Sequence, residues 1–390
     1  MIPYGRHFTD EDDIQAVVEV LRNAALTQGP MVQAFEDAVA TYVGARYAVA
    51  VSSATAGLHL AALAAGVGPG TSLITSPITF VASANAALYA GAEAAFCDID
   101  PATINMCPDN LPDALRKYPN ARAVIPVHYA GLPCDMPAIK AICDAAGAVV
   151  IEDAAHALGA RYADGQRVGC CAHSLMAVFS FHPVKNIATG EGGMITTNDE
   201  PTYRRLLRLR SHGINKLNDS FQLPEQATTA GVENMWYYEM QELGFHYRIS
   251  DIQCALGLSQ LKKLDQFLSR RTALASSYDQ SFASVQTIRP AQSSGHDRSG
   301  HHLYVLRIDY ATAKISRAEL MHSLMAKQIV TQVHYIPVPN QPYYQSLGFQ
   351  LAHYPNAQGF YDQALSIPLF YGLTDEQQGF VVLAIKELVP

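Results

Sequence analysis

Residues 179–193 read FSFHPVKNIATGEGG, and Lys185 lies at the centre of this stretch. An apolar pattern over Leu175–Phe181 predicts a strand, and Pro183 disfavours helix at the residue before it, so we expect the lysine on a turn at a strand end. The glycines that follow allow the backbone to approach a neighbouring surface or ligand, and Met194–Thr197 predicts a second strand. A partly desolvated, deprotonated lysine suits Schiff-base formation with a carbonyl cofactor, although most single lysines are solvated surface residues.

Strand and helix patterns alternate along the chain before this lysine. The expected strands are Tyr47–Val51, Ser72–Thr75, Ala94–Asp98, Ala123–Val127 and Val149–Glu152. The first expected helix follows a possible N-cap at Thr9 and ends near Asn23. Further helices are expected over residues 32–43, 57–65, 80–89, 111–118, 136–146 and, after the lysine, 203–211. This alternation predicts an α/β fold with a mainly parallel sheet wrapped by helices, in which ligands gather at the carboxyl ends of the strands.

A change of composition near Ser250 predicts a domain boundary. We expect a large domain over residues 1–250 and a smaller C-terminal α/β domain over residues 251–390. The smaller domain should contain helices over Ile252–Phe267, Arg317–Ala326 and Asp375–Glu387 and strands over His302–Ile308 and Val330–Tyr335. Lys216–Val232 and Gln292–Gly300 are polar and predict loops.

The composition excludes several classes of protein. The chain has 390 residues, 49% of them hydrophobic, and a formal net charge of -8 without a long basic run, which argues against nucleic-acid binding. The seven cysteines form no CxxC pair and show no metal-ligand spacing, as expected for core residues in a reducing compartment. Neither a signal peptide nor an apolar run of spanning length is present, so we expect a cytoplasmic protein without membrane contacts or a metal.

Three further positions are candidates for ligand contacts. Ser53, Ala54, Thr55 and Ala56 connect a strand to a helix, and the amides at such a helix start can bind phosphate, although a simple serine cap fits equally well. Asp153 follows a buried strand pattern and could pair with a protonated ring nitrogen or cap the next element. The local pattern alone favours Phe80 as a core residue over a surface for an aromatic cofactor.

In their order along the chain, these motifs resemble a known family. Residues 53–56, Phe80, residues 152–156, the Ser180/Lys185 pair and residues 243–252 are similar to the DegT/StrS sugar aminotransferases, and the resemblance covers essentially the whole chain. These are pyridoxal-phosphate (PLP) enzymes of the aspartate aminotransferase fold, fold type I. Residues 2–6, 26–30, 236–240 and 333–338 resemble more narrowly the transaminases of pseudaminic acid biosynthesis, which convert a UDP-linked 4-keto-6-deoxy-N-acetylhexosamine into UDP-4-amino-4,6-dideoxy-N-acetyl-β-L-altrosamine.

The resemblance implies a role for each motif around the cofactor. Lys185 would be bonded to PLP and would move the proton between substrate and cofactor, which takes the pyridoxamine phosphate (PMP) form during turnover. Asp153 would keep the pyridine nitrogen protonated, His156 would meet the ring hydroxyl, and Phe80 would stack on the ring. The phosphate would be held by Ala54, Thr55, Ala56 and Ser180.

The resemblance also implies a partner subunit and two substrates. His246 stands where the family has an Asn that reaches the phosphate of the partner's cofactor, so a homodimer with cross-subunit active sites is expected. Arg248 would face the carboxylate of the amino donor, L-glutamate. The UDP-sugar would be contacted by Tyr4, Leu26, Thr27, Gln28, Gly29, His334 and Tyr335, of which the two tyrosines could equally be interface residues.

Four other functions share part of this pattern of motifs. A transaminase for another 3-keto or 4-keto nucleotide sugar has the same motifs, because fold does not fix substrate. The related PMP-dependent sugar dehydratases carry a histidine in place of the lysine found here at Lys185. A non-catalytic PLP-binding regulator would need a separate DNA-binding segment. A nicotinamide dehydrogenase is disfavoured because Gly190–Gly193 leads into a strand and not into a helix.

Overall fold

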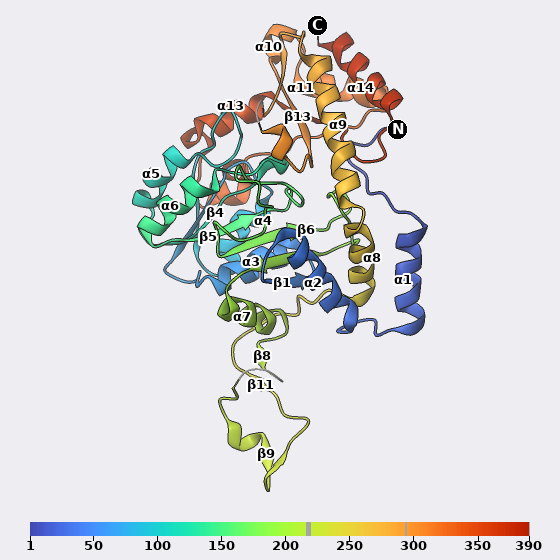
Figure 1. Ribbon diagram of the computed structural model, residues 1–390. Helices are drawn as coiled ribbons and strands as arrows, with labels where there is room; N and C mark the ends of the chain where they lie inside the picture. The colour runs from blue at the N-terminus through green and yellow to red at the C-terminus, as the bar shows by residue number, and fades with distance from the viewer. Residues whose placement is uncertain (216–219, 293–294, 390) are drawn as a thin grey trace.

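A seven-stranded sheet forms the centre of the computed structural model, which describes residues 1–215, 220–292 and 295–389 (Figure 1). The strand order is β1-β7-β6-β5-β4-β2-β3. The sheet is mainly parallel, as the sequence predicts, because β7 alone runs antiparallel to its neighbours β1 and β6. Its strands are β1 Tyr47–Val51, β2 Ser72–Thr75, β3 Glu93–Phe96, β4 Ala121–Ile125, β5 Val149–Asp153, β6 Met176–Ser180 and β7 Gly193–Thr197.

Helices cover both faces of this sheet. Helices α3, α4 and α7 contribute to the core on one face, and α2, α6 and α8 contribute to the core on the other. Side chains alternate along a strand, so Val49 of β1 belongs to the first core and Ala50 to the second. The helices are α1 Glu11–Asn23, α2 Pro30–Val43, α3 Ala54–Ala64, α4 Val81–Tyr89, η1 Pro108–Asn110, α5 Leu111–Lys117, η2 Tyr129–Gly131, α6 Met136–Ala146, α7 Glu200–Arg210 and α8 Asp251–Leu261.

Several helices begin at other residues than the sequence predicts, and for two of them the N-cap explains the difference. The first helix is capped by Asp10 and not by Thr9, because the Asp10 side chain accepts from the Asp13 amide and Asp13 returns a bond to the Asp10 amide. Helix α3 begins at Ala54, three residues before the expected start near Gly57, because Ser53 caps it. Lys185 lies between β6 and β7, as predicted.

A second, three-stranded antiparallel sheet has its own core near the two chain termini (Figure 1). The N-terminal residue Ile2 pairs with Ile329 beside it. Division of the chain at residue 250 stays a proposal. The elements of this sheet and its core are α9 Leu264–Phe282, β12 Ile288–Pro290, β13 Tyr304–Ile308, α10 Tyr310–Ala313, α11 Arg317–Ala326, β14 Ala364–Ile367 and α14 Asp375–Leu388. The same part of the chain contains η4 His296–Arg298 and four short elements that contribute to a core of the central sheet, namely η5 Val338–Asn340, α12 Pro342–Ser346, η6 Leu351–His353 and α13 Pro355–Gln363.

The C-terminal third departs from the predictions at two places. The single helix predicted over Ile252–Phe267 is two helices, since α8 ends at Leu261 and α9 runs on to Phe282, burying residues at helical spacing such as Arg271, Leu274 and Tyr278. The strand predicted over Val330–Tyr335 is wrong. That segment is irregular, makes one isolated bridge from Gln332 to Ser366, and turns several side chains toward a cavity.

An arm formed by residues 220–243 projects away from the body of the molecule (Figure 1). It carries η3 Pro224–Gln226, the strand pair β9 Thr228–Thr229 and β10 Val232–Glu233, and β11 Glu239–Met240, which pairs with β8 Ile214–Asn215. Of the two predicted loops, residues 216–219 and 293–294 lie outside the described residues. Large apolar side chains of the arm are exposed, namely Leu223, Val232, Met235, Trp236, Tyr238, Met240 and Leu243.

Within the described residues, no helix combines the length and the apolar character that crossing a membrane requires. The cytoplasmic location stays a prediction.

Candidate active site

The carboxyl ends of β1, β5 and β6 lie at one edge of the central sheet, and a cavity of about 610 Å³ opens there. Thr55 follows β1, Asp153 ends β5, Ser180 ends β6, and Lys185 stands on the turn after β6; all four line the cavity. Parallel strands place their ligand-binding ends together in this way. The cavity therefore brings together residues that are far apart in the sequence.

Lys185 has the properties of a reactive amine. Its side chain is partly buried, and burial lowers the pKa to about 8, although the carboxylate of Asp153 acts in the opposite direction. Its Nζ lies 3.4 Å from Nε2 of His302. A lysine with this pKa has a far larger share of neutral, nucleophilic amine near neutral pH than a surface lysine.

Asp153 is buried and held firmly. Its Oδ1 accepts a hydrogen bond from the Ala155 amide at 3.1 Å, and its Oδ2 accepts one from Ser83 Oγ of α4 at 2.6 Å. The Ser83 hydroxyl lies 2.7 Å from Thr79 Oγ1. The carboxylate is thus fixed in one orientation on the cavity wall.

The start of α3 forms another wall. Ala54 and Thr55 line the cavity. The Ala56 amide instead donates to Oγ of Ser53 at 3.1 Å, and Ser53 is the N-cap of the helix. Strand β7 passes so close that a Cβ on Gly193 would lie 2.6 Å from the Ala54 nitrogen. Glycine is therefore required at this position for the strand and the helix start to meet.

Three rings, those of His156, Tyr335 and Phe80, form a further part of the cavity wall. His156 Nε2 lies 2.9 Å from the Tyr335 hydroxyl, and the rings of Tyr335 and Phe80 are 6.1 Å apart. Burial, followed by the positive charge of Lys185, lowers the pKa of His156 well below its ordinary value, so this ring is neutral. Phe80 is 56% exposed and lines the cavity, so its interpretation as a core residue is wrong.

The remaining residues predicted to bind substrate or cofactor divide into those that line the cavity and those that do not. Tyr4 and His334 line the cavity, with ring centroids 5.3 Å apart. The described lining does not include Ala56, His246, Arg248 or residues 26–29. Residues 26–29 are instead anchored to the start of α8, where Asp251 accepts from the Gly29 amide at 2.8 Å.

Sequence reasoning gave no role to several residues of the cavity region, and two of them, His302 and Ser83, contact predicted cofactor-binding residues. His302 lines the cavity and is buried, but the sequence marks it only as the first residue of an expected strand. Ser83, which supports Asp153, lies inside a helix pattern without any chemical signal. The one available signal was the His301-His302 pair directly before the apolar run over residues 303–306.

The opposite face of β5 carries a second buried carboxylate that does not reach the cavity. Glu152 accepts hydrogen bonds from His128 Nε2 at 2.6 Å, Tyr162 at 2.5 Å and Ser174 at 2.5 Å. The Cys134 amide donates to His128 Nδ1, which leaves Nε2 as the nitrogen that donates to Glu152. The carboxylate is fully enclosed by these donors.

The cavity suits PLP on the chemistry of its donors. An amine of lowered pKa, a fixed carboxylate and the positive end of α3 lie around one space, as the aldehyde, the ring nitrogen and the phosphate would require. The Nδ1 atoms of His156 and His302 are buried without a partner among the described residues, which is typical of a site built to receive a polar molecule.

Comparisons with known proteins agree with this site. The profile of the DegT/DnrJ/EryC1/StrS aminotransferase family matches residues 8–386. The spore coat polysaccharide biosynthesis protein SpsC of Bacillus subtilis is 39% identical, with 100% of this chain and 97% of SpsC covered.

Two solved structures are also similar over the whole chain. The candidate sugar aminotransferase Spr1654 of Streptococcus pneumoniae in its PMP form has a TM-score of 0.89 at 30% identity, covering 100% of this chain and 99% of its own, and it is also known in a PLP form. Helicobacter pylori PseC, an aminotransferase involved in pseudaminic acid biosynthesis, has a TM-score of 0.88 at 29% identity, covering 100% and 99%. The predicted fold, cofactor and class of enzyme are confirmed, and the chain belongs to the DegT/DnrJ/EryC1/StrS family as a PLP-dependent aminotransferase.

Proposed function

We propose that this aminotransferase transfers the amino group of L-glutamate to a UDP-linked 4-keto-6-deoxy-N-acetylhexosamine and forms the 4-amino sugar of a pseudaminic acid-type pathway. The observation that carries the proposal is the presence of Lys185 and Asp153 on the walls of one cavity that also has Tyr4, His334 and Tyr335 in its lining. The last three are the residues at which the resemblance expects the nucleotide sugar. Likeness to PseC over the full chain supports the same substrate class.

The residues of the cavity divide the work around the cofactor. PLP supplies an aldehyde that bonds to amines and a ring that withdraws electrons from the reacting carbon. Lys185 would hold the cofactor through its amine, and the same amine would take and return the proton at the reacting carbon. Asp153 holds the proton on the ring nitrogen from a carboxylate that Ser83 and Ala155 keep in place.

The remaining lining residues orient the cofactor. The start of α3 and the hydroxyls of Thr55 and Ser180 hold the phosphate. Phe80 offers its ring face to the cofactor ring, and neutral His156 meets the ring hydroxyl. In this arrangement no cationic side chain is needed at the phosphate, which agrees with the net negative charge of the chain.

We also propose a homodimer in which each subunit completes the site of its partner. The arm defined above exposes Trp236 to 74%, together with neighbouring apolar side chains, and apolar groups gathered on a projecting segment are typical of a surface that another chain covers. His246 lies outside the cavity of its own subunit, which fits a residue that acts across the interface. Arg248, two residues after His246 and outside the arm, would meet the carboxylate of glutamate.

Sedimentation equilibrium tests the homodimer. The full chain should sediment as a dimer, and Trp236→Ser should dissociate at lower protein concentration, with Ser220→Ala as the control variant in the same arm. A monomer at all concentrations contradicts the proposal.

The substrate is tested by identifying the product. We expect the purified enzyme with L-glutamate to aminate a UDP-linked 4-keto-6-deoxy-N-acetylhexosamine in preference to its dTDP-linked and 3-keto counterparts. Lys185→Ala should keep its melting temperature and lose turnover with every sugar. Preference for a dTDP-sugar would reject the pseudaminic assignment and leave the transaminase in place.

A transaminase for another 3-keto or 4-keto nucleotide sugar is the second candidate. The 39% identity to SpsC, a protein of spore coat polysaccharide biosynthesis, supports this alternative. The same panel of sugars distinguishes the two.

A further inference from the structure

His302 is the one cavity histidine within hydrogen-bond distance of the lysine amine among the described residues, with Nε2 3.4 Å from Lys185 Nζ. It comes from the segment before β13, a part of the chain remote from the lysine turn. Its side chain is buried, and its ring packs against the ring of His156 with centroids 4.4 Å apart. His302 therefore contacts both Lys185 and His156.

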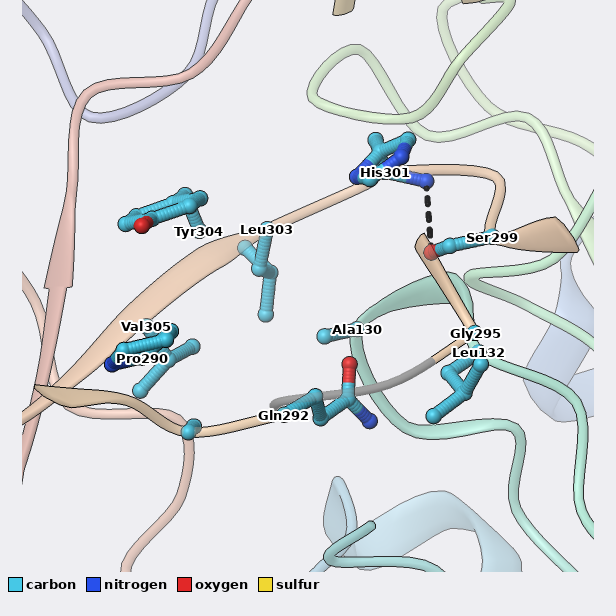
Figure 2. A pocket seen from close by; sticks show the side chains of 11 residues that line it. Ala130, Leu132, Pro290, Gln292, Gly295, Ser299, His301, Leu303, Tyr304 and Val305 are labelled. Atoms are coloured by element: carbon cyan, nitrogen blue, oxygen red, sulfur yellow. Dashed lines mark hydrogen bonds between the residues drawn. The ribbon is translucent and has the colours of Figure 1, made fainter. Parts of the chain in front are cut away.

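The backbone that carries His302 is anchored from several sides. Figure 2 shows the preceding residue, His301, whose amide donates to Ser299 Oγ at 3.1 Å beside a small cavity of about 20 Å³. The His302 amide donates to the Ala130 carbonyl at 2.9 Å. The segment is therefore fixed by η2 and by its own turn.

Arg271 adds a third anchor from α9. This arginine is buried, and its Nη1 donates to the carbonyls of His301 at 3.2 Å, His302 at 3.3 Å and Leu369 at 3.1 Å. A buried guanidinium that bonds to main-chain carbonyls fixes the course of the backbone. The same cation makes protonation of the neighbouring ring unfavourable.

The charge state of His302 follows from its surroundings. Burial, and then the positive charges of Lys185 and Arg271, lower the pKa of His302 well below its ordinary value. The ring is therefore neutral, and Nε2 is an acceptor for an N–H of the lysine ammonium. The other ring nitrogen, Nδ1, is buried without a partner among the described residues, so packing alone does not explain a histidine here.

We propose that His302 is a positioning residue for Lys185, which accepts a hydrogen bond from the lysine amine and holds it toward the reacting atoms whenever the amine is not bonded to the cofactor. The inference concerns the amine itself and holds for any keto sugar. It does not depend on the identity of the substrate.

Other groups around the amine must be counted in any pH measurement. Besides His302, the charged or titratable side chains that line this cavity are Tyr4, Asp153, His156, His182, Glu191, His334 and Tyr335. Of these, Asp153 raises the pKa of the lysine. His156 and His334 are neutral, because their pKa values are lowered by burial and by the lysine.

The experiment measures the ionisation of Lys185 in the full chain freed of cofactor. The rate of reductive methylation of Lys185 is followed by peptide mass spectrometry between pH 6 and pH 11, and the wild-type midpoint is expected at about 8. His302→Phe keeps a ring against His156 but offers no acceptor, so the ammonium loses a hydrogen bond and the midpoint should fall by about one pH unit. His302→Asn keeps an acceptor and should return the midpoint toward that of the wild type.

Two further measurements separate positioning from a structural role. His301→Asn, next in sequence but at the small cavity of Figure 2, serves as the matched control and should leave the midpoint at about 8. In the loaded enzyme, His302→Phe should lower kcat about tenfold with little change in KM for the amino donor, because the interaction concerns the amine and not substrate binding. If His302→Phe does not fold, His302→Leu replaces it with the same expectation.

A midpoint for His302→Phe or His302→Leu equal to that of the wild type, or shifted to higher pH, overturns the proposal. Equal shifts for His302→Phe and His302→Asn overturn it as well, because the acceptor would then have no role.

Discussion

Glu152 and Asp153 are consecutive carboxylates at the end of one strand, and they face opposite sides of the central sheet. Glu152 is enclosed by donors from His128, Tyr162 and Ser174. Asp153 lies on the cavity wall and is bonded to Ser83 and to a main-chain amide. Both are buried, so burial alone does not distinguish a structural acid from one that acts on a ligand.

The two carboxylates differ in whether their hydrogen bonds leave an oxygen able to accept from a ligand. The protein donors around Glu152 come from three side chains and surround both of its oxygens. A carboxylate accepts about four hydrogen bonds, and Asp153 uses two within the protein while it faces an open cavity. The buried acid with spare acceptor capacity toward a cavity is therefore the one suited to hold a cofactor proton.

The largest effect is expected from Asp153→Asn. An amide cannot stabilise a proton on the pyridine nitrogen as a carboxylate does, so kcat/KM should fall by on the order of 10³-fold. The melting temperature should stay close to that of the wild type, because an amide oxygen still accepts from Ser83. Steady-state kinetics and thermal unfolding measure both. Retention of most activity by this variant would remove Asp153 from the cofactor site.

Glu152→Gln should show the reverse pattern. All three enclosing donors lose a charged acceptor, so the free energy of unfolding should fall by about 3 kcal/mol, as measured by urea denaturation. The folded fraction should keep kcat/KM within about threefold of the wild type. If this variant loses activity as severely as Asp153→Asn, the contrast between the two faces of β5 is wrong.

The pH dependence of stability sharpens the contrast further. Burial acts to raise the pKa of Glu152, but hydrogen bonds from His128, Ser174 and Tyr162 outweigh burial and lower it below the ordinary value of 4.5. The folded protein therefore binds a proton here less readily than the unfolded chain. The stabilisation is present above about pH 4.5 and is lost as the pH falls through the lower pKa of the folded state.

Wild type and Glu152→Gln should therefore converge on acidification. Urea denaturation between about pH 5.5 and pH 3, below the range in which the unfolded His128 titrates, should show a constant difference above pH 4.5 and a shrinking difference below it. Using the difference cancels the other carboxylates that titrate in the same range. Parallel curves would show that hydrogen bonds to the ionised Glu152 do not stabilise the fold.

The sequence predicted the central sheet well because its signals are local. Strands such as Tyr47–Val51 and Ser72–Thr75 match the structure residue for residue, since each is a short apolar run bounded by turn residues. The strand predicted over Val330–Tyr335 failed because Val333 and Tyr335 line a cavity and the segment makes only one isolated bridge, from Gln332 to Ser366, among the described residues. Periodicity detects burial, and it does not tell a sheet from a cavity wall.

The site shows the same limit. Lys185 and Asp153 could be chosen because motifs mark them, and the structure places both in one cavity. His302 and Ser83 could not be chosen, because their roles depend on contacts between residues far apart in the sequence. His302 lies 117 positions from Lys185, and Ser83 lies 70 positions from Asp153. For residues 26–29, His246 and Arg248 the single chain does not supply a cavity contact, so their role stays a prediction for the dimer.

Two serines give the smallest and most selective test of the contrast. Ser83 donates to Asp153 on the cavity side, and Ser174 donates to Glu152 on the other side. Ser83→Ala should lower kcat/KM by about three- to tenfold, because Asp153 keeps its bond from the Ala155 amide but loses its orientation toward the ring nitrogen. Ser174→Ala should lower the free energy of unfolding by about 1–2 kcal/mol and leave kcat/KM unchanged.

The two serine variants are compared by the same kinetics and urea denaturation. Each removes one hydroxyl that donates to a buried carboxylate, so the loss of side-chain volume is the same. Ser83→Ala also removes the contact with Thr79 Oγ1, and Thr79→Val serves as the control for that loss. If both variants slow the reaction equally, the effect is a general loss of order in β5, and cavity-side orientation of Asp153 is not what Ser83 contributes.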